Sequence, residues 1–237
     1  MPLRARYATA WGREAGPYAL VLALSASVFA ALGAATLFWG AADEIDVRFV
    51  RWVHETSPDA LVETMRVVTN AGSGVVVAPL VVAAAAVLLH RREPGATLFV
   101  VSAVLGGQVL FRVLKQAFRR TRPELEDPYV LLSTYAFPSG HALAATVTYG
   151  SLALVLAVAV GPRRRTAVVA AAVAVIALVA ASRVVLGAHY LFDVVAGIAA
   201  GTAWLAALLL LFSRVRPTRR FVLVGGEEQP QRTGSDA

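Results

Sequence analysis

The sequence predicts an all-α membrane protein with six transmembrane helices, and three observations predict it. Apolar residues make up 58% of the 237 residues and charged residues only 16%, whereas a soluble domain contains about 25% charged residues. The apolar residues fall in runs of about 20, the length that crosses a bilayer as a helix. Basic residues gather in short clusters between these runs. We therefore expect lipid to surround most of the chain.

Six apolar runs are the expected spans, and they cover residues 17–39, 71–89, 95–114, 139–160, 166–186 and 189–212. The first run is about 22 residues long, whereas the apolar core of a signal peptide has 7–15 residues. We therefore expect it to be a membrane span and not a cleaved signal peptide. The second is the weakest, because it begins with polar and glycine residues and contains Pro79. Proline is tolerated in membrane helices where neighbours satisfy the freed backbone groups. We expect a membrane domain over residues 1–216 and, because the end of the chain is polar, a disordered cytoplasmic tail over 217–237.

The placement of charge predicts the orientation of the spans. With both termini inside, the cytoplasmic segments hold 13 basic and 5 acidic residues, a balance of +8, and the other 9 basic and 10 acidic residues give −1. Basic residues accumulate on the cytoplasmic side of membrane proteins. We therefore expect a multi-pass protein of the cytoplasmic membrane with both termini inside. These clusters also account for the net charge of +7 without a nucleic-acid partner.

The outer ends of the last four spans carry three polar segments that a lipid-facing helix would avoid. The first begins at Lys115, the only lysine among the 22 basic residues. Lys115 and Arg122 are seven positions apart, so on one helix they share a face about 10 Å apart, and Pro123 should end that helix near Arg122. Two such cations can reach one anion. A basic collar that extends to the lipid headgroups is the alternative, but a basic cluster on the outer side opposes the charge trend.

The second segment is Pro138-Ser139-Gly140-His141, directly before the fourth span. Serine caps helix N-termini, and glycine lets a ligand approach the backbone. Free N–H groups and the helix dipole at such a start favour an anion, and His141 is placed to donate a proton to a bound phosphate ester. An ordinary N-cap would explain the serine but not the histidine.

The third segment combines Ser182-Arg183 with His189 and Asp193. His189 and Asp193 are four positions apart, so in the first turns of the last span the carboxylate can hold the imidazole in one tautomer and raise its basicity. Arg183 is expected near the outer end of the fifth span, where an ionisable residue is a functional candidate. A purely structural His–Asp hydrogen bond is the alternative.

Together the three segments resemble the tripartite signature of the type 2 phosphatidic acid phosphatase superfamily. That signature is Lys, six residues, Arg-Pro; then Pro-Ser-Gly-His; then Ser-Arg, five residues, His, three residues, Asp. Every fixed position is matched without a spacing error, by Lys115, Arg122, Pro123, Pro138, Ser139, Gly140, His141, Ser182, Arg183, His189 and Asp193. The motifs span residues 115–193, and the six-helix layout extends the likeness to most of the chain.

The resemblance implies a role for each matched residue. His189 would attack phosphorus and form a phosphohistidine, with Asp193 orienting it, and His141 would protonate the leaving alkoxide and then activate water. The phosphoryl oxygens would be bound by Lys115, Arg122, Ser139, Gly140 and Arg183.

No metal and no cofactor are expected. Three cations around one point would repel a divalent ion, and the superfamily is metal-independent. The chain has no cysteine, which excludes thiolate metal sites and cysteine nucleophiles.

The expected function is hydrolysis of a lipid phosphate on the outer leaflet. The expected substrates are an isoprenoid diphosphate such as undecaprenyl diphosphate, then phosphatidylglycerol phosphate or phosphatidic acid. A phosphotransferase using the same phosphohistidine and a non-catalytic lipid-binding or transport protein are the alternatives; the presence of both histidines and the aspartate argues against the second. Residues 124–137, with several acids and aromatics, are expected to shape lipid entry.

Overall fold

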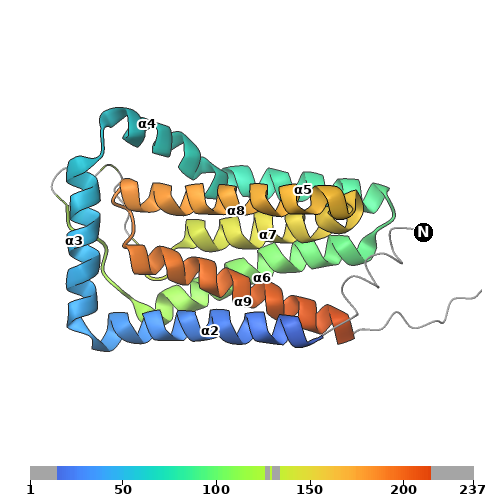
Figure 1. Ribbon diagram of the computed structural model, residues 1–237, viewed down its shortest axis with the longest axis horizontal. Helices are drawn as coiled ribbons and strands as arrows, with labels where there is room; N and C mark the ends of the chain where they lie inside the picture. Colours follow the sequence, from blue (N-terminus) through green and yellow to red (C-terminus); the bar gives the residue numbers. More distant parts are fainter. Residues whose placement is uncertain (1–14, 126–128, 130–133, 215–237) are drawn as a thin grey trace, which may run out of the picture.

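Long helices that run side by side form the body of the molecule (Figure 1). The computed structural model describes residues 15–125, 129 and 134–214, and every regular element in that part is a helix. The all-α class expected from the sequence is therefore confirmed. The expected tail over 217–237 and half of the loop over 124–137 lie outside the described residues.

Among the described residues, five helices are long and apolar enough to cross a membrane. Each has 21 to 25 residues, which at 1.5 Å per residue exceeds or matches the hydrocarbon thickness of about 30 Å. Their bounds lie within four residues of the expected spans: α2 (Ala15–Phe38), α6 (Pro94–Phe118), α7 (Gly140–Val160), α8 (Pro162–Val185) and α9 (Leu191–Arg214).

The weak second span is a broken one. Helix α4 (Asp59–Val68) continues into the short 3-10 helix η1 (Thr69–Gly72), and α5 (Gly74–His90) follows after Ser73 with a bend of 42°. Counted as one span, this pair brings the total to six. The sequence placed the span at 71–89, because the polar residues of α4 hide its continuity with α5. Gly72 permits the close approach at the break, since a Cβ there would lie 2.6 Å from a methyl group of Val179 and 3.1 Å from the carbonyl oxygen of His141.

Helix α7 lies at the centre of the bundle and packs against α5, α6, α8 and α9. Leu143 and Val147 on this helix are fully buried. Glycines on α9 let the two helices approach closely, because a Cβ at Gly197 would lie 2.6 Å from the carbonyl oxygen of Ser139. This packing fixes the first turn of α7 against α9, where the second and third polar segments meet.

Helix α3 (Gly40–Thr56) was not expected from the sequence. It crosses the end of the bundle at which α8 ends and α9 begins (Figure 1). Val47, Val50 and Val53 pack against residues of α8, α9 and the segment before α7, so one apolar face covers this end of the molecule. Asp46 is also buried, and it forms an ion pair with Arg120, which follows α6.

Candidate active site

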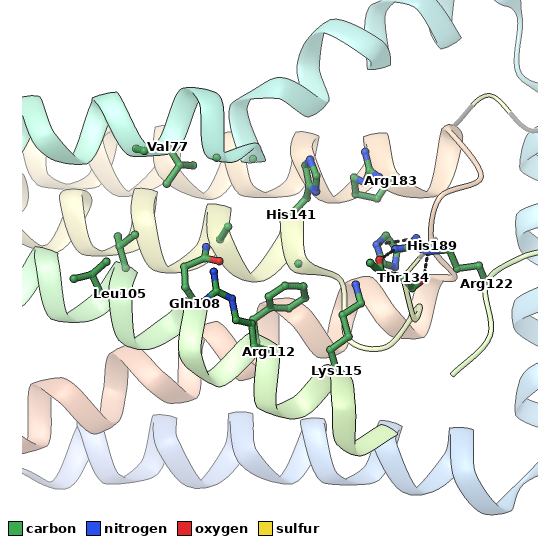
Figure 2. A pocket seen from close by; sticks show the side chains of 17 residues that line it. Val77, Leu105, Gln108, Arg112, Lys115, Arg122, Thr134, His141, Arg183 and His189 are labelled. Atoms are coloured by element: carbon green, nitrogen blue, oxygen red, sulfur yellow. Dashed lines mark hydrogen bonds between the residues drawn. The ribbon is translucent and has the colours of Figure 1, made fainter. Parts of the chain in front are cut away.

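One cavity of about 570 Å³ collects most of the site residues that the sequence predicts. Figure 2 shows several of their side chains around it. The predicted residues that line it are Lys115, Arg122, Gly140, His141, Arg183 and His189. The other two, Ser139 and Asp193, are fully buried beside it, and the Ser139 N–H donates to the Asp193 carbonyl oxygen at 2.9 Å.

The first segment reaches the cavity by a route that differs from the expected one. Helix α6 ends at Phe118, and Arg119 takes the left-handed conformation with φ 48°. Lys115 and Arg122 therefore do not share a helix face, and the expectation that Pro123 ends the helix is wrong. Lys115 is buried in the last turn of α6, with its ammonium 4.7 Å from the centre of the Phe111 ring, a favourable distance for a cation–π contact.

Arg122 comes to the cavity from the extended chain after α6. Its guanidinium donates to the Thr134 carbonyl oxygen at 2.5 Å, to the Thr134 hydroxyl at 2.9 Å, and to the carbonyl oxygen of Ala188. Its Nη1 also lies 3.4 Å from Nε2 of His189. Three acceptors thus hold this cation next to one ring nitrogen of His189.

The start of α7 agrees only in part with the expected N-cap. Ser139 occupies the N-cap position, but its hydroxyl makes no capping hydrogen bond. At Gly140 an added Cβ would lie 2.7 Å from the Phe111 ring, so the glycine is required by helix packing as well as by any ligand. His141 follows in the first turn and lines the cavity.

The spacing between Arg183 and His189 is fixed by the turn that ends α8. The Ala188 N–H donates to the Arg183 carbonyl at 3.0 Å and the Gly187 N–H to the Val184 carbonyl at 2.9 Å, the bond pair of a Schellman motif. Gly187 has φ +64°, the left-handed conformation that this motif needs and that glycine adopts without strain. The same turn lets the His189 N–H reach the Arg183 carbonyl at 3.2 Å.

His189 lies in this turn, two residues before α9 begins, and its side chain is 2% exposed. Nδ1 lies 3.5 Å from an Asp193 carboxylate oxygen, beyond ordinary hydrogen-bond length, so the contact is mainly electrostatic. Burial lowers the pKa of His189 to about 4, although Asp193 raises it in part. The imidazole is therefore neutral at pH 7, with a lone pair on one nitrogen.

Arg120 is the site residue that sequence reasoning missed. Its guanidinium donates to an Asp193 carboxylate oxygen at 2.7 Å, and to Asp43 and Asp46 on α3 at 2.5 and 3.0 Å. It also lies over the Tyr190 ring, 4.2 Å from the centroid. Burial alone would lower the pKa of Arg120, but the ion pairs with Asp193 and Asp46 outweigh it and raise the pKa.

Asp193 is held from three directions. Besides the ion pair with Arg120, Oδ2 of Asp193 accepts a hydrogen bond from the Tyr190 N–H at 3.0 Å. In a capping box, an acidic side chain in the first helical turn likewise accepts from the N–H of the residue before the helix. Its other contact is His189. The carboxylate that faces the imidazole is therefore fixed by both α9 and the segment after α6.

Three buried polar atoms at or beside the cavity have no hydrogen-bond partner among the described residues: the Ser139 hydroxyl, Nε of Arg183, and Nδ1 of His189, which faces the Asp193 carboxylate at 3.5 Å. Arg183 is 3% exposed and uses Nη1 to reach the Thr69 hydroxyl at 2.7 Å. Buried polar groups in proteins are almost always hydrogen-bonded, so unpaired donors here indicate a ligand that accepts hydrogen bonds. Within the described ranges no group of three or more His, Asp or Glu side chains is arranged to hold a metal ion.

Known proteins resemble this chain in sequence and in fold. The sequence matches the PAP2 superfamily over residues 96–217. It is 31% identical to phosphatidylglycerophosphatase B of Bacillus subtilis over 158 residues, 65% of this chain and 73% of that protein. It is 35% identical to a lipid A 1-phosphatase of Rhizobium johnstonii, over 51% of this chain and 48% of that protein. The structure resembles the crystal structure of a transmembrane PAP2-type phosphatidylglycerolphosphate phosphatase from Bacillus subtilis, with a TM-score of 0.77 and 26% identity over 84% of this chain and 98% of that one.

The helical bundle and the cation-lined cavity define a multi-pass membrane phosphatase. The chain belongs to the PAP2 superfamily, which confirms the family expected from the motifs. Since these relatives are lipid phosphatases, the protein is a membrane lipid phosphatase.

Proposed function

We propose that the protein removes the terminal phosphate of a lipid phosphate or diphosphate through a phosphohistidine on His189. The observation that carries the proposal is a buried imidazole with Asp193 beside one nitrogen and Arg122 beside the other. Burial lowers the pKa of this imidazole to about 4, which favours its neutral form at pH 7. Arg183 and Lys115 line the same cavity. A nucleophile without charge, surrounded by fixed cations, suits attack on a dianionic phosphate.

In the first step Nε2 of His189 forms a bond to phosphorus while the bond to the leaving oxygen breaks. Nδ1 keeps its proton toward Asp193, so the positive charge that develops on the ring is stabilised by that carboxylate. His141 donates its proton to the leaving oxygen. The lipid product leaves as an alcohol, or as a monophosphate when the substrate is a diphosphate.

In the second step water attacks the phosphohistidine. His141, now without its proton, accepts one from the water, and the bond between Nε2 and phosphorus breaks to give inorganic phosphate. In both steps Lys115, Arg122 and Arg183 stabilise charge on the phosphoryl oxygens. The unpaired Ser139 hydroxyl and Nε of Arg183 donate further hydrogen bonds to them. With charge already neutralised by three cations, the reaction needs no metal.

The apolar part of the cavity suits a lipid tail. Below the cations it is lined by Val77 of α5 and by Val104 and Leu105 of α6. Leu105 is 63% exposed, so the cavity borders the lipid-facing surface of the membrane region. An isoprenoid diphosphate such as undecaprenyl diphosphate is our first candidate. Phosphatidylglycerol phosphate and phosphatidic acid follow, the former supported by the names of the Bacillus relatives.

Release of inorganic phosphate in detergent micelles tests the proposal. Purified protein is expected to hydrolyse at least one of these lipids at an undiminished rate in excess EDTA, because no step uses a metal. Vanadate should inhibit, since it mimics the pentacoordinate phosphoryl transition state. Absence of phosphate release from every lipid would contradict the proposal. Activity that is lost in EDTA and restored by magnesium would contradict its metal-free chemistry.

We further propose that the active site faces the outer side of the cytoplasmic membrane, with both termini inside. The charge balance of the loops supports this orientation, and it requires the broken pair α4–α5 to count as one span. Single cysteines replacing Glu124, exposed after α6, and Arg164, exposed at the start of α8, test it. In intact cells an impermeant thiol reagent should label position 124 and spare 164. The opposite pattern would place the site in the cytoplasm, and labelling at both positions would mean that the span count is wrong.

A further inference from the structure

Arg112 is a charged residue inside a membrane-spanning helix that the mechanism does not use. It lies six residues before the end of α6, about 9 Å below the outer end of that helix. No carboxylate in the described part of the chain forms an ion pair with it. Charged residues within spans are costly and mark functional positions unless they extend to the headgroups.

The direction of the side chain argues against such an extension. In Figure 2 the guanidinium of Arg112 points along α6 toward Gln108, away from the end of the helix at which Lys115 lies. Long side chains on helices lean toward the helix N-terminus, which for α6 is the end opposite the active site. Arg112 and Gln108 both line the catalytic cavity. The guanidinium therefore points into the cavity, toward the apolar part that Val77, Val104 and Leu105 line.

Arg112 also borders a second cavity of about 560 Å³, which shares Phe111, Lys115 and Thr134 with the first. Open space on both sides leaves the guanidinium accessible to a ligand. Arg112 lies three residues deeper than Lys115, about 4.5 Å along the axis of α6. Leu105 follows two turns deeper still. The order along α6 is therefore a cation for the scissile phosphate, a second cation, an amide, and then apolar side chains.

We propose that Arg112, with Gln108, binds a second phosphate located between the scissile phosphate and the lipid tail. The inference rests on the proposed function, because it places the scissile phosphate at Lys115 and the tail along Leu105. A guanidinium binds phosphate oxygens through paired, charge-assisted hydrogen bonds. A lipid diphosphate and phosphatidylglycerol phosphate both carry such a second anion. Phosphatidic acid carries only uncharged ester groups at that level, so the subsite favours lipids with two phosphates.

Steady-state kinetics of Arg112→Gln in micelles tests the inference with three lipids: phosphatidic acid, phosphatidylglycerol phosphate and an isoprenoid diphosphate. We expect kcat/KM to fall about 10- to 100-fold on the two lipids with a second phosphate and to stay unchanged on phosphatidic acid. The activity on phosphatidic acid also shows that the variant is folded. Arg51→Gln, which removes an exposed arginine of α3, is the matched control and should change none of the three values.

The two lipids that carry a second phosphate should respond differently to the substitution. On the diphosphate, whose second phosphate gains charge as it leaves, kcat should fall and KM rise; on phosphatidylglycerol phosphate only KM should rise. An equal loss on all three lipids, no loss on any, or a wild-type enzyme that hydrolyses only phosphatidic acid would overturn the inference and leave the proposed function standing. A wild-type enzyme that hydrolyses none of them would overturn the proposed function and the inference with it.

Discussion

His189→Ala is expected to lower turnover by several orders of magnitude, because it removes the nucleophile of the proposed mechanism. The side chain is buried and small relative to the cavity it borders, so the variant should fold and insert normally. Phosphate release from the best lipid substrate measures the loss. His90→Ala is the matched control, since His90 is exposed at the C-terminal end of α5 and the variant should retain full activity.

The same experiment identifies the intermediate when it is extended to His141→Ala. In the proposed mechanism His141 is the base that activates water against the phosphohistidine, so without it a substrate with a good leaving group should phosphorylate the variant and stop there. Brief treatment with such a substrate is expected to give an acid-labile, base-stable phosphoprotein in His141→Ala and none in His189→Ala. If His189→Ala retained one tenth or more of wild-type activity, or formed a phosphoprotein, the assignment of the nucleophile would be contradicted.

Much of this site could be predicted because its spacing is tied to helix ends. The apolar runs mark the ends of α7, α8 and α9 to within four residues, and those ends place His141, Arg183 and His189 on one side of the bundle. The glycine-containing turn after α8 then determines where His189 lies. Local patterns of this kind need no knowledge of distant contacts.

The parts that were missed depend on contacts between distant segments. Nothing between Phe118 and Pro123 breaks a helix in sequence, yet α6 ends at Phe118, and the chain after it extends to bring Arg120 to Asp193. The partners of Arg120 on α3 are 74 and 77 residues away. Helix α3 itself is amphipathic rather than uniformly apolar, so a search for membrane spans passes over it.

Arg120→Met is the second variant with a large expected effect. It keeps the bulk of the side chain but leaves the carboxylates of Asp46 and Asp193, which are 1% and 0% exposed, without their cation. Removing one partner of a buried ion pair costs about 3–5 kcal/mol in the free energy of unfolding. Thermal or denaturant unfolding in detergent measures this loss. Arg119→Met, at the exposed neighbouring position, should cost less than about 0.5 kcal/mol.

The loss of stability in Arg120→Met is expected to depend on pH. Burial already raises the pKa of Asp46, and the ion pair with Arg120 lowers it in part, so the pKa rises further in Arg120→Met. A carboxyl whose pKa is raised by folding binds its proton more tightly in the folded state, and its charge destabilises the protein as pH rises through that pKa. The deficit of the variant should therefore be largest at neutral pH and shrink in acid. A deficit that does not depend on pH would contradict this.

Activity separates a merely structural role of Arg120 from a positioning one. Adding Asp46→Asn to Arg120→Met removes one of the uncompensated charges, so the double variant should regain part of the lost stability. It does not restore the contact between Arg120 and Asp193, which fixes the carboxylate facing His189. If Arg120 positions Asp193, kcat of the folded double variant stays low while KM is nearly unchanged, because the cations proposed to bind phosphate are intact. Recovery of kcat together with stability would show that Arg120 only holds α3 in place.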